Sequence, residues 1–364
     1  MSSIISLDYT GNFNRFDTEN MYDQIISLPK QIEESYFNQE KSELAIYYKN
    51  ISKVYICGMG GSAISGDIAK SLFGDTLKIR VFKDYYLPTF LDENTLGIVC
   101  SYSGNTAETV ACFETLRKKG AQIAIVTSGG ILKHYGSQEG YLMKLVPTGF
   151  QPRAAIGHLF FSIVKILEEL GLIEDQNINV KLTHLNLTTK LKLINQDVEE
   201  GKNFAKGLAM KLYKKIPIIY SSNPRLFPLA YRFKCQINEN AKTHAFCNTF
   251  SEMNHNEIEG WETDYNNSLV PVFISNFDEE KMYLDRVNAF KEILKTTEEE
   301  KKKENPSYEE MDFLEIFTDG KTLMGKTFST IFLCDMISYY LAILNRVNPS
   351  SIKFIDSLKK TIKS

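Results

Sequence analysis

The sequence predicts an α/β protein built from two tandem domains, each a doubly wound parallel sheet, with a helical segment in front of them. The chain has 364 residues, which at about 150 residues a domain indicates two domains. Short apolar runs rich in β-branched residues alternate with longer helical patterns, as in parallel sheets. Two of these runs, near residues 57 and 100, end in turns rich in small and hydroxyl side chains. Ligands bind at this edge of such sheets.

The first 50 residues carry apolar side chains at helical spacing, so we expect helices that pack on the first domain. The first domain is predicted at 51–170, with alternating strands and helices. Its strands are expected at 54–57, 78–82, 97–101, 122–127 and 142–146, and its helices at 62–72, 106–119, near 132 and at 154–170.

Residues 171–190 lack this alternation of strand and helix patterns and contain scattered polar residues, which is typical of a linker. The second domain is predicted at 191–364 and repeats the alternation without a visible sequence repeat. The charged run at 296–306 is interpreted as a solvated helix end or loop. Strands are expected at 216–221, 245–249, 269–275 and 312–317, and helices at 190–213, 226–240, 279–295, 325–346 and 350–363.

Composition excludes several classes of protein. A net charge of −3 argues against a nucleic-acid-binding surface spread over the chain. The six cysteines show no C-x-x-C spacing. Cys57 and Cys100 end apolar runs and Cys334 lies in an apolar helical pattern, which predicts small core residues in a reducing compartment. The N terminus lacks a basic segment followed by a long apolar run, and no window of 18 apolar residues occurs, so we expect no membrane contact and a cytoplasmic protein.

The turn after the first strand is a candidate anion site. G-M-G-G-S at 58–62 follows the apolar run 54–57 and precedes a helical pattern. Glycine lets the backbone approach a ligand closely, and the unpaired N–H groups of a helix start attract anions. The spacing differs from the dinucleotide fingerprint G-x-G-x-x-G. We expect Gly60, Gly61 and Ser62 to contact an anion; the competing interpretation is a tight turn without a ligand.

A second turn favours phosphate as that anion. Ser101, Ser103 and Thr106 place three hydroxyls within six positions, whereas capping the next helix needs only one. Phosphate binds several neutral donors around helix starts, and the turn at 127–130 is expected to form a third wall. A Walker-A lysine and a metal-binding aspartate do not accompany these turns in the sequence, which argues against nucleotide triphosphate chemistry.

These motifs resemble a known family. G-M-G-G-S at 58–62 and S-Y-S-G-N-T-A-E-T at 101–109 are similar to the signature of sugar isomerase (SIS) domains, flavodoxin-like domains that bind phosphosugars. Further segments resemble one branch of that family, the bifunctional phosphoglucose/phosphomannose isomerases, and the resemblance spans about residues 50 to 364. These segments lie at 151–157, 237–242, 252–257 and 340–359.

The resemblance implies a role for four further residues. Glu239, which lies among amides and beside Lys242, is the base that moves a proton between adjacent carbons. His255 opens the sugar ring and serves the other subunit of a homodimer whose sites lie at the interface. Arg153 binds substrate and stabilises the enediolate, a role suited to a fixed guanidinium. Lys359, or its neighbour Lys360, contacts substrate oxygens near the ring.

Each of these residues also has an ordinary structural interpretation. Glu239 could be a helix-end charge, His255 a surface histidine, Arg153 a salt-bridge partner and Lys359 a helix-end cation. Isomerisation through an enediol runs on acid and base groups alone. We also do not find the His/Glu ligand sets of zinc-dependent mannose phosphate isomerases in the sequence. We therefore expect neither cofactor nor metal, and a phosphosugar as substrate.

Two other functions stay open on the sequence. A phosphosugar-sensing regulator would usually carry a helix-turn-helix domain, and the 50 residues before the first strand are too few and not basic enough for one. An isomerase or lyase of another phosphosugar shares the same fold, and fold alone does not separate these activities. Whether mannose 6-phosphate is accepted beside glucose 6-phosphate is also not decided by the motifs.

Overall fold

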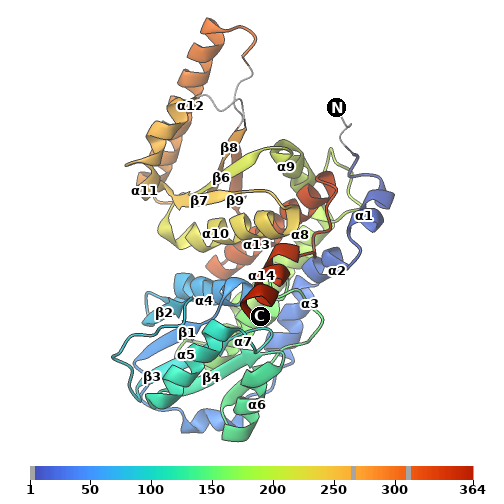
Figure 1. Ribbon diagram of the computed structural model, residues 1–364. Coiled ribbons are helices and arrows are strands. Elements are labelled where there is room, and N and C mark those ends of the chain that lie inside the picture. The colour runs from blue at the N-terminus through green and yellow to red at the C-terminus, as the bar shows by residue number, and fades with distance from the viewer. Residues whose placement is uncertain (1–4, 264–267, 309–312, 364) are drawn as a thin grey trace. The chain divides into compact units, whose positions relative to one another are not determined.

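The structure is a computed structural model that describes residues 5–263, 268–308 and 313–363. The chain divides into two compact units, shown with their elements in Figure 1. Gln24–Leu185 holds a sheet of five strands and is called the five-stranded unit. Met1–Asp23 together with Asn186–Ser364 holds a sheet of four strands and is called the four-stranded unit.

The five-stranded unit is a parallel, doubly wound sheet, as predicted. Its strand order is β2-β1-β3-β4-β5, and every neighbouring pair is parallel. This is the flavodoxin-like order, whose ligand crevice lies at the carboxyl ends of β1 and β3, where the direction of winding reverses. Its elements are α3 (Leu28–Ile32), η1 (Glu33–Phe37), η2 (Glu43–Tyr47), β1 (Lys53–Cys57), α4 (Gly60–Phe73), β2 (Ile79–Phe82), β3 (Thr95–Cys100), α5 (Ala107–Lys118), β4 (Gln122–Thr127), α6 (Gly130–Glu139), β5 (Leu142–Leu145) and α7 (Ile156–Glu169).

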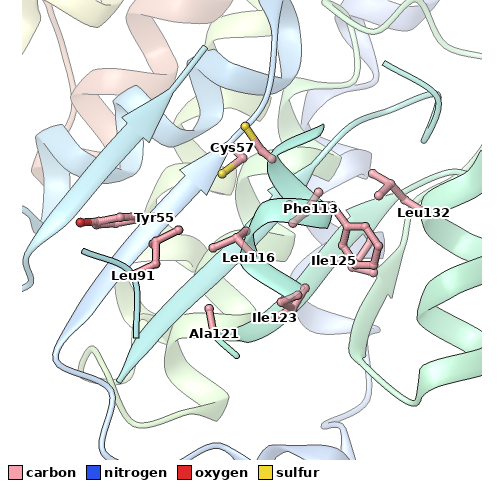
Figure 2. Packing of buried hydrophobic residues seen from close by; sticks show 11 residues of the cluster. Tyr55, Cys57, Leu91, Phe113, Leu116, Ala121, Ile123, Ile125 and Leu132 are labelled. Atoms are coloured by element: carbon pink, nitrogen blue, oxygen red, sulfur yellow. The ribbon is translucent and has the colours of Figure 1, made fainter. Parts of the chain in front are cut away.

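Alternating side chains of β1 explain why both faces of this sheet are covered. Tyr55 and Cys57 point to a buried cluster that includes Phe113 and Leu116 of α5 (Figure 2). Ile56, between them, lies against Gly66 of α4 on the other face. Successive residues of a strand face opposite sides, so a strand covered on both faces reads as a continuous apolar run. That is the run visible in the sequence.

The four-stranded unit repeats the parallel architecture with the order β7-β6-β8-β9. Helix α12 continues to Glu304, so most of the charged run is a helix end, one of its two predicted forms. Asp312 of the fourth expected strand lies outside the described residues. The elements are α1 (Thr10–Phe16), α9 (Phe204–Leu212), β6 (Ile216–Ser221), η3 (Pro224–Leu226), α10 (Phe227–Gln236), η4 (Ile237–Ala241), β7 (Phe246–Thr249), α11 (Phe250–Met253), η5 (Glu257–Glu262), β8 (Leu269–Asn276), α12 (Lys281–Glu304), β9 (Leu314–Thr318), α13 (Leu323–Leu344) and α14 (Lys353–Lys363).

Helix α13 is the core helix of the four-stranded unit. It is long and apolar enough to cross a membrane by length and composition, but its most apolar stretch is completely buried inside the protein. It packs against α9, α10 and η4. A helix that is apolar on all sides needs such a surrounding, so we interpret α13 as a core helix.

The predicted helical N-terminal segment is divided between the units, which corrects the expectation that all of residues 1–50 pack on the first domain. Met1–Asp23 belongs to the four-stranded unit, where Phe13 stacks on Tyr339 with ring centroids 6.1 Å apart. The part from Gln24 onward belongs to the five-stranded unit, as expected. Helical periodicity identifies an apolar face but not the surface that the face will cover, which is why the division was not visible in the sequence.

The predicted linker is also different. Residues 177–194 form α8 (Asn177–Ile194), and the boundary between the units falls inside this helix, after Leu185. The expected long helix at 190–213 is instead the end of α8 and the separate helix α9, which begins behind an Asn203 side-chain cap. A half-exposed helix needs few apolar side chains. The many polar residues of α8 were therefore mistaken for those of a loop.

The three cysteines predicted to be core residues, Cys57, Cys100 and Cys334, are buried, and so is Cys112. Cys235 and Cys247 are half-buried. Burial raises the pKa of the Cys100 thiol to about 12. A thiol in such an environment stays protonated and behaves as a small apolar side chain.

Candidate active site

The glycine turn connects β1 to α4 at the crevice of the five-stranded sheet. A Cβ atom on Gly58 would lie 2.7 Å from the carbonyl oxygen of Cys100, so glycine allows β1 and β3 to bring their turns together. Gly60 has a φ of +50°, which favours glycine. Ser62 is buried, and its Oγ accepts a hydrogen bond from the backbone N–H of Tyr102 at 3.1 Å. The two predicted turns are therefore in direct contact.

The hydroxyl turn at 101–106 is held by its own side chains. The buried Ser101 Oγ donates to Thr106 Oγ1 at 3.1 Å and accepts from the Gly104 N–H at 3.2 Å. Ser103 is exposed. Thr106 occupies the predicted N-cap position of α5, but its hydroxyl makes no cap hydrogen bond there. The hydroxyl is thus directed to Ser101 instead of to the helix.

The two helix starts at this crevice share one property. The N-cap residues of α4 and α5, Met59 and Thr106, make no side-chain cap hydrogen bond. The same is true of other helices, such as α6 and α7, so this property alone does not mark a site. Uncapped N–H groups at a helix start can bind an anion, and what is particular to α4 and α5 is that the glycine turn and the hydroxyl turn meet at their starts.

The turn at 127–130 forms the expected third wall. Ser128 donates to the carbonyl oxygen of Tyr102 from its backbone N–H at 2.9 Å and from its Oγ at 2.6 Å. Gly104 has a φ of +67°, and a Cβ atom on it would lie 1.8 Å from the Gly129 carbonyl oxygen. Three turns from three adjacent strands thus pack against one another at one edge of the sheet.

Arg153 belongs to the same edge. Its side chain is almost fully buried, and its Nη1 donates to Gln151 Oε1 at 3.4 Å. A Cβ atom on Gly61 would lie 2.8 Å from both the Pro152 carbonyl oxygen and the Arg153 Cα. The structure therefore brings the predicted phosphate-binding turns and Arg153 together, although about 90 residues separate them in sequence.

Two residues that the sequence did not single out hold Arg153 in place. The Tyr102 hydroxyl donates to the Pro147 carbonyl oxygen at 2.9 Å and accepts from the Phe150 N–H at 2.8 Å. Gln31 of α3 donates to the Ala154 carbonyl oxygen at 2.9 Å and accepts from the Gly157 N–H at 3.0 Å. The position of Tyr102 between two candidate serines was the only signal in the sequence.

His158, in the first turn of α7, is a buried core histidine. Its Nδ1 lies 2.8 Å from Ser35 Oγ, and its ring packs edge-on against Phe150. Burial lowers the pKa of His158 to about 4, with a smaller contribution from Lys30. His158 is therefore neutral near pH 7 and supports the segment around Arg153 without a charge.

Gly61→Ala tests whether the glycine turn has to touch the Arg153 turn. Overpacking of this kind lowers the free energy of unfolding by about 1–3 kcal/mol. It should also move the Arg153 turn away and raise KM for the predicted phosphosugar about tenfold, because a displacement of a binding residue by about 1 Å can lower activity by even more. The control is Gly207→Ala in α9, where no atom lies within 4 Å of the added Cβ. Steady-state kinetics should show the change in Gly61→Ala alone; an unchanged KM there would contradict the assignment.

Glu239 lies in a π-turn at the end of α10. Residues 237–241 form η4, which ends at Lys242 with a left-handed φ of 56°. Asn240, in the same turn, is buried and donates to Ser338 Oγ of α13 at 2.9 Å. π-Turns are rare and are frequent at functional sites. The sequence predicted a regular helix here and missed the turn.

A buried charged network fixes the helix that carries Glu239. Asp335 of α13 accepts from Arg232 Nη2 at 2.5 Å and from Gln236 Nε2 at 2.9 Å. All three side chains are buried. Removing one partner from such a network leaves an unpaired buried group, so α10 and η4 are held firmly against the core helix α13.

A cavity of about 920 Å³ opens beside Glu239 within the four-stranded unit. Its walls include Asn238, Lys242, His244 and Arg346. This volume is typical of small-molecule sites. No role was predicted for His244 and Arg346, and the structure shows that they share a cavity with the predicted base.

His255 and Lys359 do not line this cavity. His255 is exposed in the loop after α11, and its backbone N–H donates to the Glu252 carbonyl oxygen at 3.1 Å. Lys359 and Lys360 are exposed on α14. The nearest α14 residues in the wall are Lys353, Phe354 and Ile355. The roles of His255 and Lys359 therefore remain predictions.

The corresponding edge of the four-stranded sheet is filled by a side chain of the protein. Ser222 and Asn223 follow β6 as the glycine turn follows β1. Ser222 Oγ donates to Glu279 Oε2 at 2.5 Å, and Asn223 Nδ2 donates to both Glu279 oxygens at 2.8 Å. A carboxylate that already accepts these hydrogen bonds repels a second anion. Of the two sheet edges compared among the described residues, the geometry supports a phosphate position at that of the five-stranded unit.

Comparison with known proteins identifies similar chains. Residues 201–362 match the model of the bacterial phospho-glucose isomerase C-terminal SIS domain. A bifunctional phosphoglucose/phosphomannose isomerase of Caldicellulosiruptor bescii is 35% identical over 94% of this chain and 98% of its own. A D-glucosamine-6-phosphate 4-epimerase of Sulfolobus acidocaldarius is 32% identical over 68% of this chain and 78% of its own.

A solved structure supports the same fold. The crystal structure of a glucose-6-phosphate isomerase like protein from Thermus thermophilus superimposes with a TM-score of 0.63, covering 98% of this chain and 99% of that one. At 14% identity, this likeness supports the overall fold and no more.

Proposed function

Since the chain belongs to the family of bifunctional phosphoglucose/phosphomannose isomerases, we propose that it interconverts glucose 6-phosphate and mannose 6-phosphate with fructose 6-phosphate. The observation that carries the proposal is the set of hydroxyl turns at two uncapped helix starts, packed against the buried Arg153. Phosphorylated substrates and reduced cysteines fit the cytoplasmic location that the sequence predicts.

We assign the phosphate group to the crevice of the five-stranded sheet. Gly60 and Gly61 would expose backbone N–H groups at the start of α4, and Ser62, Ser101, Ser103 and Thr106 would supply hydroxyl donors. Neutral donors around helix starts suit a dianion because they need no side-chain charge. Arg153 would hold substrate oxygens from the adjacent turn, with its guanidinium kept in one orientation by burial.

We assign the proton transfer to Glu239. Its carboxylate would remove the proton from C2 of the open-chain aldose; the C2–H electron pair forms the C1–C2 double bond, and the carbonyl oxygen gains a proton to give the enediol. Returning the proton to C1, with the electron pair of the C1–C2 double bond forming the new C1–H bond, and losing the proton of the C2 hydroxyl to give the C2 carbonyl yields the ketose. Because C2 is planar in the enediol, glucose 6-phosphate and mannose 6-phosphate lead to the same intermediate. No cofactor is needed for these steps.

We assign ring opening to His255 of a partner subunit in a two-fold dimer. His255 is exposed, and it is absent from the walls of the cavity that holds Glu239; both facts suit a residue that acts in a neighbouring copy. Two-fold dimers are the commonest oligomers. Lys359 would contact substrate oxygens near the ring.

Subunit mixing tests this arrangement. Co-expression of the inactive variants Glu239→Gln and His255→Ala gives mixed dimers in which one site has both wild-type residues if His255 acts across the interface. With random pairing in a two-fold dimer, about a quarter of wild-type activity should return. If His255 acts within its own subunit, every site carries a defect and the mixture stays inactive. Light scattering during the assay checks that the active species is a dimer.

The direct test of the activity is turnover of each substrate. We expect the purified protein to convert both aldose phosphates to fructose 6-phosphate, with and without EDTA, as followed by NMR. Conversion of glucose 6-phosphate alone would restrict the proposal to one epimer. Binding without turnover would favour a sensor. Because one relative is named an epimerase of D-glucosamine 6-phosphate, that compound is the third substrate to test, and its selective turnover would replace the proposal.

A further inference from the structure

Arg346 adopts a backbone conformation that normally belongs to glycine. The core helix α13 ends in a Schellman motif: the Val347 N–H donates to the Ala342 carbonyl oxygen at 3.1 Å, and the Arg346 N–H donates to the Ile343 carbonyl oxygen at 2.9 Å. Arg346 is the residue just beyond the cap and has a φ of +59°. Glycine is the usual residue at this position because a side chain is strained there.

Two of the three described cations with positive φ line the same cavity. Among the described residues, the non-glycine positions with positive φ are two asparagines, which tolerate this conformation, and three cations. Lys242 and Arg346 are two of these cations, and both line the cavity beside Glu239. Lys214, the third, precedes β6 and is not part of that cavity.

The two strained turns are joined to each other. Asn345 Nδ2 donates to the Ala241 carbonyl oxygen at 2.8 Å and to Thr243 Oγ1 at 2.9 Å. Lys242 Nζ donates to the carbonyl oxygen of Glu239 and to that of Pro349 at 3.4 Å. These contacts join the segment 239–243 to the segment 345–349, so the position of Arg346 relative to Glu239 is fixed by several hydrogen bonds. We assign Lys242 the role of holding these two segments together.

We propose that Arg346 is a substrate-binding residue that contacts the oxygen on which negative charge develops when Glu239 takes the proton. This inference rests on the proposed function and adds to it a residue in the same cavity. As the C–H electron pair forms the new double bond, the former carbonyl oxygen becomes an enolate oxygen. A guanidinium stays positively charged and presents several N–H donors in a fixed plane, which stabilises that charge more than it stabilises the neutral carbonyl.

The proposal explains why a strained residue occupies the turn. A turn kept only for structure would be more stable with glycine, so Arg346→Gly should raise the melting temperature by about 2 °C. The same change should lower kcat/KM about 10- to 100-fold, as expected for one lost hydrogen bond to a charged group. Arg346→Lys keeps a charge without the planar fork and should give intermediate kinetics. Lys214→Gly, the matched control, should stabilise the protein and leave kcat/KM unchanged.

Inhibitor binding separates a substrate contact from a general structural effect. An aldonic acid phosphate, whose carboxylate resembles the enediolate, should lose affinity for Arg346→Gly by the same factor as kcat/KM. Inorganic phosphate, assigned to the other unit, should bind both proteins equally. Lower stability with unchanged kinetics in Arg346→Gly, or equal loss of inorganic phosphate, would overturn the inference. A wild-type protein that does not isomerise any of the sugar phosphates would instead reject the proposed function.

Discussion

Glu239→Gln is expected to lower kcat by about 10²- to 10⁴-fold, the usual contribution of general acid–base catalysis. Glutamine keeps the shape and the hydrogen-bonding capacity of the side chain but lacks the basic carboxylate. KM should change little, because the proton acceptor matters in the transition state and not in substrate binding. Glu239 is half-buried in a turn whose anchoring contact is made by Asn240, so the variant should fold normally.

Isotope exchange decides whether Glu239 is the base. In D₂O the wild-type protein should place deuterium on the carbon next to the carbonyl, and Glu239→Gln should do so far more slowly. Glu252→Gln is the matched control: Glu252 is exposed in the histidine loop, where it accepts from Asn256 Nδ2 at 2.8 Å, and exchange there should stay at the wild-type rate. Exchange at the wild-type rate in Glu239→Gln would transfer the role of base to Glu252 or Glu257.

Ser101→Ala combined with Ser103→Ala is expected to raise KM for the phosphosugars about 100-fold or more. Each hydrogen bond to a charged group contributes roughly 1.5–3 kcal/mol, and the two hydroxyls are assigned to the same phosphate. Loss of Ser101 also removes the contacts of its Oγ with Thr106 and Gly104, so the effects of the two changes need not be additive.

A serine turn at the corresponding edge of the second sheet supplies the control for this variant. Ser222 follows β6 as Ser62 and its neighbours follow β1, but its hydroxyl donates to Glu279. Ser222→Ala should therefore leave KM unchanged, as measured by steady-state kinetics and by inhibition with inorganic phosphate. A normal KM in the Ser101/Ser103 double variant would place the phosphate elsewhere.

Prediction from sequence succeeded where the signal is local. Strand β4 (Gln122–Thr127) and strand β6 (Ile216–Ser221) have the predicted bounds, because a strand buried on both faces is a short apolar run. The glycine and hydroxyl turns were also placed correctly between strand and helix, since glycine and small hydroxyl residues reflect the backbone conformation of the turn itself.

Prediction failed where two similar local solutions compete. The expected regular helix over 226–240 ends in the π-turn η4. The hydrogen bonds of a π-turn span one residue more than those of an α-helix, so the two structures have similar sequence patterns. The backbone conformation at the C-terminal end of α13, at Arg346, was also not predictable from the sequence. An apolar helix followed by Pro349 predicts a stop, but not that an arginine will take the left-handed position.

The sequence by itself therefore determined the α/β architecture, the glycine turn and the hydroxyl turn, because each of these depends on the chemistry of neighbouring residues. The residues proposed for the reaction were taken from the resemblance to a known family. Only the tertiary structure decided that Arg153 lies against Gly61, that Glu279 fills the corresponding edge of the second sheet, and that Arg346 and Lys242 share a cavity with Glu239. The physical reason is that these contacts join segments tens to about a hundred residues apart. Their geometry depends on how helices and strands pack, and that packing cannot be predicted from the periodicity of neighbouring residues.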